Sequence, residues 1–191
     1  TPLGDVVHST PTVVGAPNFG YSDGLEPSAP YSAFKEAWNN VDCDDAQKER
    51  EPILYFGAND GALHGISACS GEERIAYVPN AMFDADQNGV PKLNKLTSPN
   101  YAHEYYVDGP ATVVDAFWGS GWHTTLVGTL RGGGKAVFAL DVTDPSRFSD
   151  EGTAVAGTNP VVLWEIDDTT DANSDDVPDF AHLGYTFSQP A

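Results

Sequence analysis

One stretch decides the fold of this chain: Ile53-Leu54-Tyr55-Phe56-Gly57-Ala58-Asn59-Asp60-Gly61-Ala62-Leu63-His64-Gly65-Ile66-Ser67-Ala68. Two short apolar runs, 53–57 and 62–68, enclose a turn made of small and polar residues. Short apolar runs bounded by turn residues are typical of antiparallel β-strands. The stretch therefore predicts a β-hairpin. The chain's 19 glycines and 14 prolines predict many turns and few long helices.

The same pattern recurs later in the chain. The run 125–128, the turn 131–134 and the run 135–141 repeat the strand, turn and strand of the first stretch. Thr-Val-Val precedes the two copies at 12–14 and 112–114, and apolar runs carrying Tyr77 and Trp164 follow them at 74–78 and 161–166. Each copy thus predicts a four-stranded antiparallel meander. Radial repetition of such units is typical of a β-propeller, so we predict an all-β fold made of propeller blades.

The repeats also predict how the chain is organised. We expect one blade-like unit at about 5–80, a second at about 105–167, and the start of a third at 183–191. Two blades and a beginning cannot close a ring, so we expect the chain to be part of a larger propeller that supplies the remaining blades. The predicted insertions lie at 20–50, 80–102, 144–159 and 167–180, the first with a short helix around 31–38.

Composition excludes several classes of partner. The 191 residues carry a formal net charge of -19, which disfavours contact with nucleic-acid phosphates and with anionic membrane surfaces. No apolar run approaches the roughly 20 residues that a membrane-spanning helix needs, so no membrane span is expected. Hydrophobic residues make up 40% of the chain, enough for a packed core.

A second informative stretch is Asp171-Ala172-Asn173-Ser174-Asp175-Asp176-Val177-Pro178-Asp179. It alternates oxygen-bearing side chains with small or turn-forming residues, and its seventh residue can offer a backbone carbonyl, as in EF-hand-type loops. It departs from the EF-hand at position 6, which is Asp176 rather than Gly, and at position 12, which is His182 rather than Glu. A solvated acidic turn is the alternative. We predict a Ca²⁺ site, with the ion held by Asp171, Asn173, Asp175, the carbonyl of Val177, and Asp179.

A weaker metal candidate begins in the same way at Asp84, Asp86 and Asn88. Lys92 and Lys95 occupy positions 9 and 12, where a calcium loop needs acids. Asn88-Gly89 is in addition a strong turn signal. The sequence therefore favours a tight turn here, with weak metal affinity at most.

The two cysteines, Cys43 and Cys69, stand 26 residues apart. In an oxidising compartment a disulfide between them would stabilise the fold by roughly 3 to 4 kcal/mol in the loop-entropy model. Two buried free thiols are the alternative, and two cysteines alone do not separate these cases.

The residue patterns do not favour catalysis. The chain has five histidines, none of them in a His-x-x-x-His pair. His103, beside Glu104, is the most suggestive of the five, and a structural role in a turn is the better interpretation. We predict no catalytic residues.

Several segments together resemble the C-terminal propeller of the PilC/PilY family, the tip-associated adhesins and biogenesis factors of bacterial type IV pili. The matching segments are 4–11, 55–64, 98–109 and 139–145. Ala68-Cys69-Ser70-Gly71-Glu72 is similar, with alterations, to a turn in quinoprotein-like propeller blades. The family uses a calcium loop of the Asp-x-Asp/Asn-x-Asp-x-x-x-Asp type, and 171–179 fits it at each position.

The resemblance implies a calcium-binding module of a pilus protein, with roles in pilus assembly, in extension against retraction, and in adhesion. It implies export through the periplasm and display outside the cell or at the outer membrane, at the pilus tip. The implied partners are pilin or minor pilin subunits and a host or abiotic surface. Two other functions stay open: a fragment of a quinone- and calcium-dependent propeller dehydrogenase, and a purely structural propeller segment.

Overall fold

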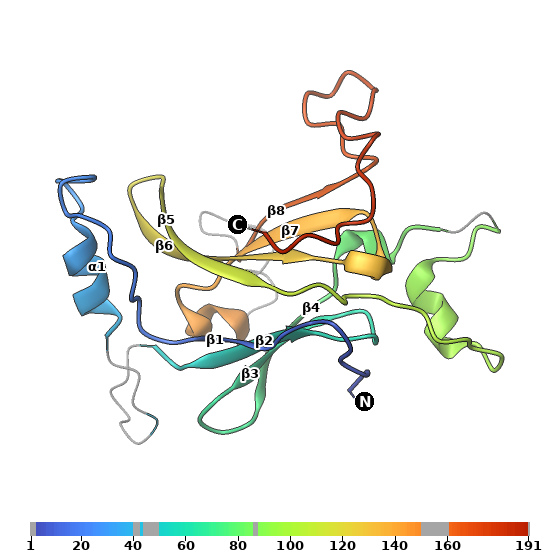
Figure 1. The fold of residues 1–191 in the computed structure, drawn as a ribbon, viewed down its shortest axis with the longest axis horizontal. Helices are drawn as coiled ribbons and strands as arrows, with labels where there is room; N and C mark the ends of the chain where they lie inside the picture. The colour runs from blue at the N-terminus through green and yellow to red at the C-terminus, as the bar shows by residue number, and fades with distance from the viewer. Residues whose placement is uncertain (1–2, 40–42, 44–49, 86–87, 150–160, 191) are drawn as a thin grey trace.

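The computed structural model describes residues 3–39, 43, 50–85, 88–149 and 161–190. Two four-stranded antiparallel sheets make up its body (Figure 1), as the repeat predicts. The first contains β1 (Thr12–Val14), β2 (Ile53–Gly57), β3 (Leu63–Ser67) and β4 (Glu73–Tyr77) in that order. The second contains β5 (Thr112–Trp118), β6 (Gly121–Thr129), β7 (Ala136–Asp141) and β8 (Val162–Asp167), also in chain order.

The two Thr-Val-Val segments occupy equivalent positions. Thr12 pairs with Tyr55 of β2, and Thr112 pairs with Val127 of β6. Both sheets also shift register near the middle of their third strand, at Gly65/Ile66 and at Ala139/Leu140. Because topology, register and irregularity all repeat, the sheets are two copies of one unit, and the predicted blades are confirmed.

The strand β6 is longer than the sequence predicts. The expected run covered 125–128, whereas the strand begins at Gly121, directly after a tight turn in which Gly119 has φ 64°. The added segment pairs with the end of β5, for instance His123 with Ala116. Cross-strand pairing therefore extends a strand whose own residues give a weak local signal.

The core lies between the sheets. Tyr55 and Leu63 of the first sheet and Leu126 and Phe138 of the second belong to one buried cluster. The rings of Tyr77 and Phe138 pack together, with their centroids 5.0 Å apart. Burial of such large side chains contributes about 1.5 to 3 kcal/mol each, so packing between the sheets dominates their association.

A single glutamate also joins the sheets. Glu165 of β8 accepts hydrogen bonds from the hydroxyl of Tyr77 (2.7 Å) and from the backbone N–H groups of Asn80 (2.8 Å) and Ala81 (3.0 Å). The last two open the short 3₁₀ helix η1 (Asn80–Met82), whose first N–H groups have no partner within the helix.

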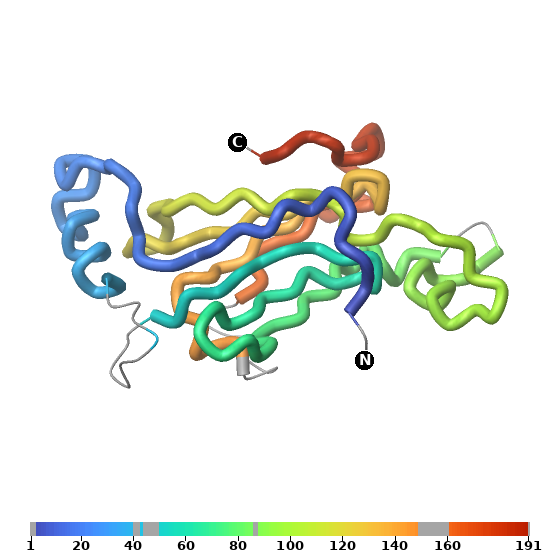
Figure 2. Tube along the Cα trace, turned by 60° about the horizontal axis from the view of Figure 1, so that its bottom comes forward, coloured from blue at the N-terminus to red at the C-terminus, as the bar shows by residue number. Residues whose placement is uncertain are grey.

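The first two insertions lie at opposite ends of the molecule (Figures 1 and 2). The first carries α1 (Tyr31–Ala37), which confirms the predicted short helix. The second carries the 3₁₀ helix η2 (Lys92–Thr97). Two further 3₁₀ turns, η3 (Arg131–Gly133) and η4 (Pro145–Ser149), flank β7.

Hydrogen bonds between the units repeat along the chain. Thr12 Oγ1 donates to the carbonyl of Ala111 (3.3 Å), just before the first strand of the next unit. Thr112 Oγ1 donates to the carbonyl of Pro190 (2.7 Å) in the C-terminal segment. Each first-strand threonine thus holds the segment that follows the last strand of its unit and leads away from it.

The segments between units also contact the turn between the second and third strands of the preceding unit. The N–H of Val107 donates to Ala58 after β2, and the N–H of Thr186 donates to Gly134 before β7. Thr186 Oγ1 also accepts from the N–H of Leu130 (3.1 Å). Residues 183–190 contain no assigned strand, but they follow the path that 104–111 take from the first unit to the second.

Candidate calcium loop and its surroundings

The predicted calcium loop projects from the body of the structure after β8 (Figure 1). Its base is tied to the second sheet: Asp167 Oδ1 accepts from the N–H of Thr169 (2.8 Å) and from the hydroxyl of Thr170 (2.9 Å). The N–H of Asp179 donates to the carbonyl of Thr170 (3.0 Å) and closes the neck. The nine residues 171–179 thus form a closed excursion between β8 and the C-terminal segment.

The carboxylate of Asp171 organises the loop. Its oxygens accept hydrogen bonds from the backbone N–H groups of Ser174 (2.7 Å), Asp175 (3.2 Å) and Asp176 (2.8 Å). Burial acts to raise the pKa of Asp171, but the N–H groups of Asp176, Asp175 and Ser174 outweigh it, and the pKa lies below its usual range. The first residue of the loop is therefore held in its charged form.

The other predicted ligands bond within the loop too. Asn173 Oδ1 accepts from the N–H of Asp175 (3.0 Å), and Asp175 Oδ1 accepts from the N–H of Val177 (3.0 Å). Asp179 accepts from the N–H of Ala172 (2.9 Å) and from the amide of Asn173 (3.3 Å).

The backbone of the loop turns sharply. Ser174 and Asp176 have φ of 62° and 65°, the left-handed region that non-glycine residues seldom adopt. Asp176 therefore takes, without being glycine, the conformation for which EF-hand loops use glycine at this position. The departure found in the sequence at position 6 does not prevent the turn.

The donor set of the loop suits a hard cation. The predicted side-chain ligands are carboxylates and one amide, and 171–179 contain no Cys or His that would favour zinc or copper. Among the described residues, no three or more His, Cys, Asp or Glu side chains form a group ready to hold a metal ion. A cation would have to draw the loop carboxylates closer together than they lie here. The calcium site stays a prediction.

The weaker candidate at 84–88 is described in part, because Asp86 lies outside the described residues. Here the backbone makes a turn: Gly89 has φ 75°, and Lys92 N donates to the carbonyl of Asp84 (3.0 Å). Burial, with the nearby carboxylates of Asp167 and Asp168, raises the pKa of Asp84.

Lys92 is used elsewhere in the fold. Its ammonium group donates to the carbonyl of Gly133 and lies 5.1 Å from the ring centroid of Tyr106. Burial lowers the pKa of this ammonium group. The lysine at position 9 thus fastens the insertion to the second unit.

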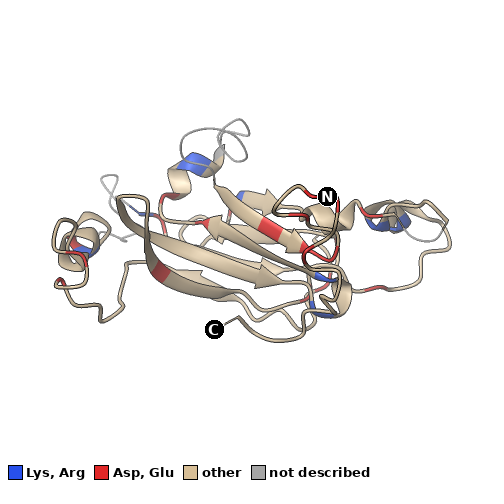
Figure 3. Ribbon diagram, turned by 90° about the horizontal axis from the view of Figure 1, so that it is seen from above, with Lys and Arg blue, Asp and Glu red and all other residues tan. Residues whose placement is uncertain are grey.

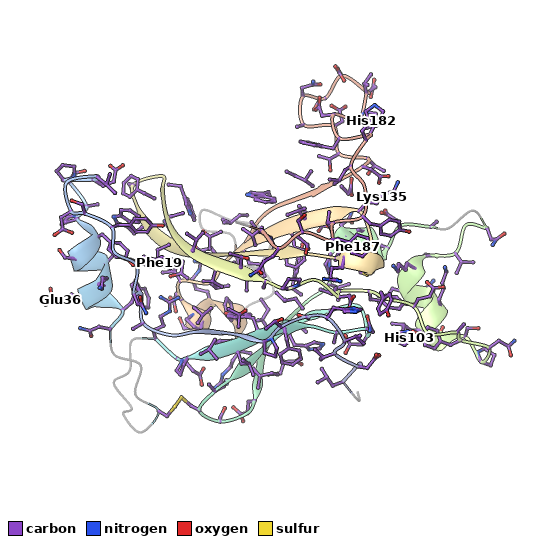
Figure 4. All side chains as sticks on the ribbon, viewed as in Figure 1. Phe19, Glu36, His103, Lys135, His182 and Phe187 are labelled. Carbon is purple, nitrogen blue, oxygen red and sulfur yellow. A yellow bond between two sulfur atoms is a disulfide. The ribbon has the colours of Figure 1, made fainter. Side chains whose placement is uncertain are left out.

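A disulfide joins Cys43 to Cys69 (Figure 4, yellow bond). Their Cα atoms lie 5.2 Å apart, within the usual range for disulfides. Cys69 lies two residues after the end of β3, so the bond ties the first insertion to the turn between β3 and β4. This is the pairing expected for an exported protein.

Four of the five histidines pair with carboxylates. His8 Nδ1 lies 2.7 Å from Asp108, His103 Nε2 lies 2.9 Å from Asp5, and His123 Nδ1 lies 3.1 Å from Asp141. His64 contacts two acids, Glu73 at 2.5 Å and Asp60 at 3.1 Å. The pairs of His8 and His103 connect segments that lie far apart in the chain. The fifth, His182, lies on the projecting segment (Figure 4).

Acidic side chains are distributed over both sheets and their loops (Figure 3). In the described part of the chain, none of the helices has the length and apolar character needed to cross a membrane.

The fold can be compared with known proteins. The sequence model of the PilY1 beta-propeller domain matches residues 3–191. The chain belongs to this family. Its repeated four-stranded sheets are therefore blades of the PilY1 β-propeller, as the resemblance to the PilC/PilY family implied.

Relatives and a solved structure agree with this assignment. The chain is 42% identical over 193 residues to the type IV pilus biogenesis factor PilY1 of Pseudomonas aeruginosa PAO1, covering 98% of the chain and 13% of that protein. It is 40% identical over 191 residues to a PilY1 homolog of Xylella fastidiosa, covering 98% and 13%. The crystal structure of the Pseudomonas aeruginosa PilY1 C-terminal domain matches with a TM-score of 0.56 and 37% identity, over 94% of this chain and 28% of that one.

Proposed function

We propose that this chain is a calcium-binding propeller segment of a type IV pilus biogenesis protein, in which the ion binds at 171–179. The observation that carries the proposal is the loop itself. Oxygen ligands alternate along a backbone that already turns at Ser174 and Asp176, around the charged carboxylate of Asp171. Ca²⁺ accepts an irregular shell of such oxygens more readily than Mg²⁺, which demands octahedral geometry.

The proposed ligands are those that the sequence predicts: Asp171, Asn173, Asp175, the carbonyl of Val177, and Asp179. Bound calcium would neutralise clustered carboxylates and fix the loop. Extracellular calcium modules bind at roughly 10⁻⁴ to 10⁻³ M, so occupancy would follow the ambient calcium concentration. Ordering a projecting loop changes the surface offered to a partner.

The names of the relatives support a role in the pilus, although the chain spans 13% of their length. We propose that the parent protein supports pilus assembly, controls extension against retraction, and takes part in attachment to a host or abiotic surface. Its partners would be pilin or minor pilin subunits. Its place would be the pilus tip, outside the cell, after export through the periplasm.

A matched pair of variants tests the calcium site. Asp175→Ala removes a proposed ligand, whereas Asp176→Gly removes the same charge at a position whose φ of 65° suits glycine. Calorimetric titration should show at least about tenfold weaker calcium binding for the first and little change for the second. Equally weakened calcium binding in both variants would mean that the loss of one negative charge, and not the loss of a ligand, explains the effect. Absence of calcium uptake by the unaltered chain at millimolar calcium would reject the site.

The cellular role needs its own measurement. The same two substitutions in the parent protein should differ in their effect on the number of surface pili, counted at low and at millimolar calcium. Asp175→Ala should lose the response of pilus number to calcium, and Asp176→Gly should keep it. The same response in both variants would dissociate the loop from pilus control, even if the loop binds calcium.

A further inference from the structure

A pocket of about 320 Å³ lies where the segments that enter successive units meet the turn after β6. It is separate from the calcium loop. Figure 4 labels one of its walls, Phe187. The side chains that define it are His8, Tyr105, Asp108, Arg131, Tyr185 and Phe187.

Three of these residues occupy the same place in consecutive units. Thr12 and Thr112 have the same register, so His8 and Asp108, four residues before each, correspond. Phe187 corresponds to Asp108 because Thr112 bonds to the carbonyl of Pro190 as Thr12 bonds to that of Ala111, and Phe187 and Asp108 each stand three residues before that carbonyl. Equivalent residues of successive blades are related by rotation about the axis of a propeller, so a pocket that brings three of them together lies close to that axis.

The walls of the pocket are aromatic. Tyr185 and Phe187 are 57% and 56% exposed, and Tyr105 is 37% exposed. The rings of Tyr185 and Phe187 lie 6.3 Å apart at an angle of 48°. Exposed aromatic faces in a concave site suit a flat ring, which they can cover by stacking.

One cation stands among these rings. The guanidinium carbon of Arg131 lies 5.5 Å from the ring centroid of Phe187. Asp108, the nearest acid in the pocket, is already bonded by the backbone N–H of His8 (3.1 Å) and by its Nδ1 (2.7 Å). Its distance to Arg131 Nε is 3.9 Å, too long for a hydrogen bond. Within the described residues, that Nε is buried and has no hydrogen-bond partner.

The backbone of Arg131 is unusual as well. Its φ is 49°, a conformation that costs a non-glycine residue energy, although three glycines follow it directly. Unfavourable backbone conformations of this kind concentrate at binding sites. The strain holds a guanidinium fork beside the aromatic rings, and a planar fork of donors matches a carboxylate.

We propose that this pocket binds a carboxylate carried on a flat ring, with Arg131 holding the carboxylate and Tyr185 and Phe187 covering the ring. The site is independent of calcium and goes beyond the proposed role of the loop. Arg131 has one acid beside it in the pocket, Asp108, whose carboxylate lies 3.9 Å from Nε, in a chain whose net charge is -19. Charge therefore selects the ligand along with shape.

Small probes test the chemistry directly. Titration calorimetry with benzoate and with the neutral benzamide tests whether the pocket recognises the carboxylate. The pair glucuronate and glucose asks the same question for a sugar ring. Benzoate should bind with a dissociation constant on the order of 1 mM, as expected for a ligand of this size, and benzamide should bind at least about tenfold more weakly. Glucuronate, whose ring is puckered and not flat, should bind more weakly than benzoate, and preference for glucuronate would overturn the proposal.

Variants locate the binding. Arg131→Gly removes the guanidinium and relieves the backbone strain, so the protein should stay folded while affinity for the acid falls at least about tenfold. Phe187→Leu should weaken both acid and neutral probe. Lys135→Gln removes a nearby cation that pairs with Asp168 at 2.7 Å and does not line the pocket, so it should leave binding unchanged. Equal binding of acid and neutral probes, no binding of any probe, or full affinity in Arg131→Gly would overturn the proposal.

Discussion

The hydroxyl of Tyr31 donates a hydrogen bond to the carboxylate of Asp115 at 2.5 Å, although 84 residues separate them. Tyr31 belongs to helix α1 in the insertion of the first unit, and Asp115 belongs to β5 of the second. The other oxygen of Asp115 accepts from Thr124 Oγ1 (2.7 Å). Trp122 adds a bond from its indole N–H to the carbonyl of Ala29 (2.9 Å). The insertion therefore links the two units.

Loss of this hydroxyl should destabilise the protein. Tyr31→Phe leaves an oxygen of the buried Asp115 without its donor, which costs about 1 to 3 kcal/mol. Tyr21→Phe is the control, because its ring packs in the same aromatic cluster, 5.2 Å from that of Tyr31. Urea unfolding followed by tryptophan fluorescence should show the loss only for Tyr31→Phe. Equal stability of the two variants would mean that the bond adds nothing.

The disulfide should be present in exported protein. Thiol titration of the unfolded, unreduced protein should find no free groups, and two free thiols would contradict the pairing. Closing 26 residues between Cys43 and Cys69 should stabilise the fold by roughly 3 to 4 kcal/mol. The double variant Cys43→Ser, Cys69→Ser should unfold at correspondingly lower urea, and reducing agent should then have no further effect.

His64 should make stability depend on pH. Its hydrogen bond to Asp60 raises the pKa of the imidazole, burial opposes this, and Glu73 raises the pKa further. A raised pKa in the folded state means that the added stability is complete below the unfolded value of about 6.5 and is lost as pH rises through the folded value. The stability difference between wild type and His64→Gln should therefore shrink as pH rises above about 6.5. A difference that stays constant with pH would exclude His64 as the source.

The repeated threonine bonds can be tested against each other. Thr112→Val keeps the shape of the side chain and removes the donor to Pro190, which should cost about 0.5 to 1.5 kcal/mol. Hydrogen exchange at Thr186 should become faster in this variant. Thr12→Val removes the equivalent bond to Ala111 and should leave exchange at Thr186 unchanged. Faster exchange at Thr186 in both would indicate general loosening instead of a local contact.

Much of the fold could be predicted because its signals are local. Thr12–Val14 and Thr112–Val114 fall in equivalent strands, since alternating apolar runs and the turns between them are set by neighbouring residues. The short helix at Tyr31–Ala37 was also visible in the sequence. The loop at 171–179 was found by its spacing alone, and its metal remains to be measured.

The contacts between units could not be predicted in this way. Glu165 bonds to Asn80, 85 residues earlier in the chain, and nothing near either residue indicates the other. The pocket beside Arg131 is built from four separate segments, so no single stretch shows it. The positive φ of Arg131 could not be predicted from the sequence pattern either.

The hydrogen bond from the N–H of Tyr106 to Asn59 Oδ1 (3.0 Å) has a consequence for the order of assembly. The segment that leads into the second unit finds its first partner on the unit already synthesised, and the segment around Thr186 does the same one unit later. Neither of these two contacts waits for sequence that has yet to be made. Such a protein can be built blade by blade as the chain emerges, each finished unit serving as the template on which the next begins.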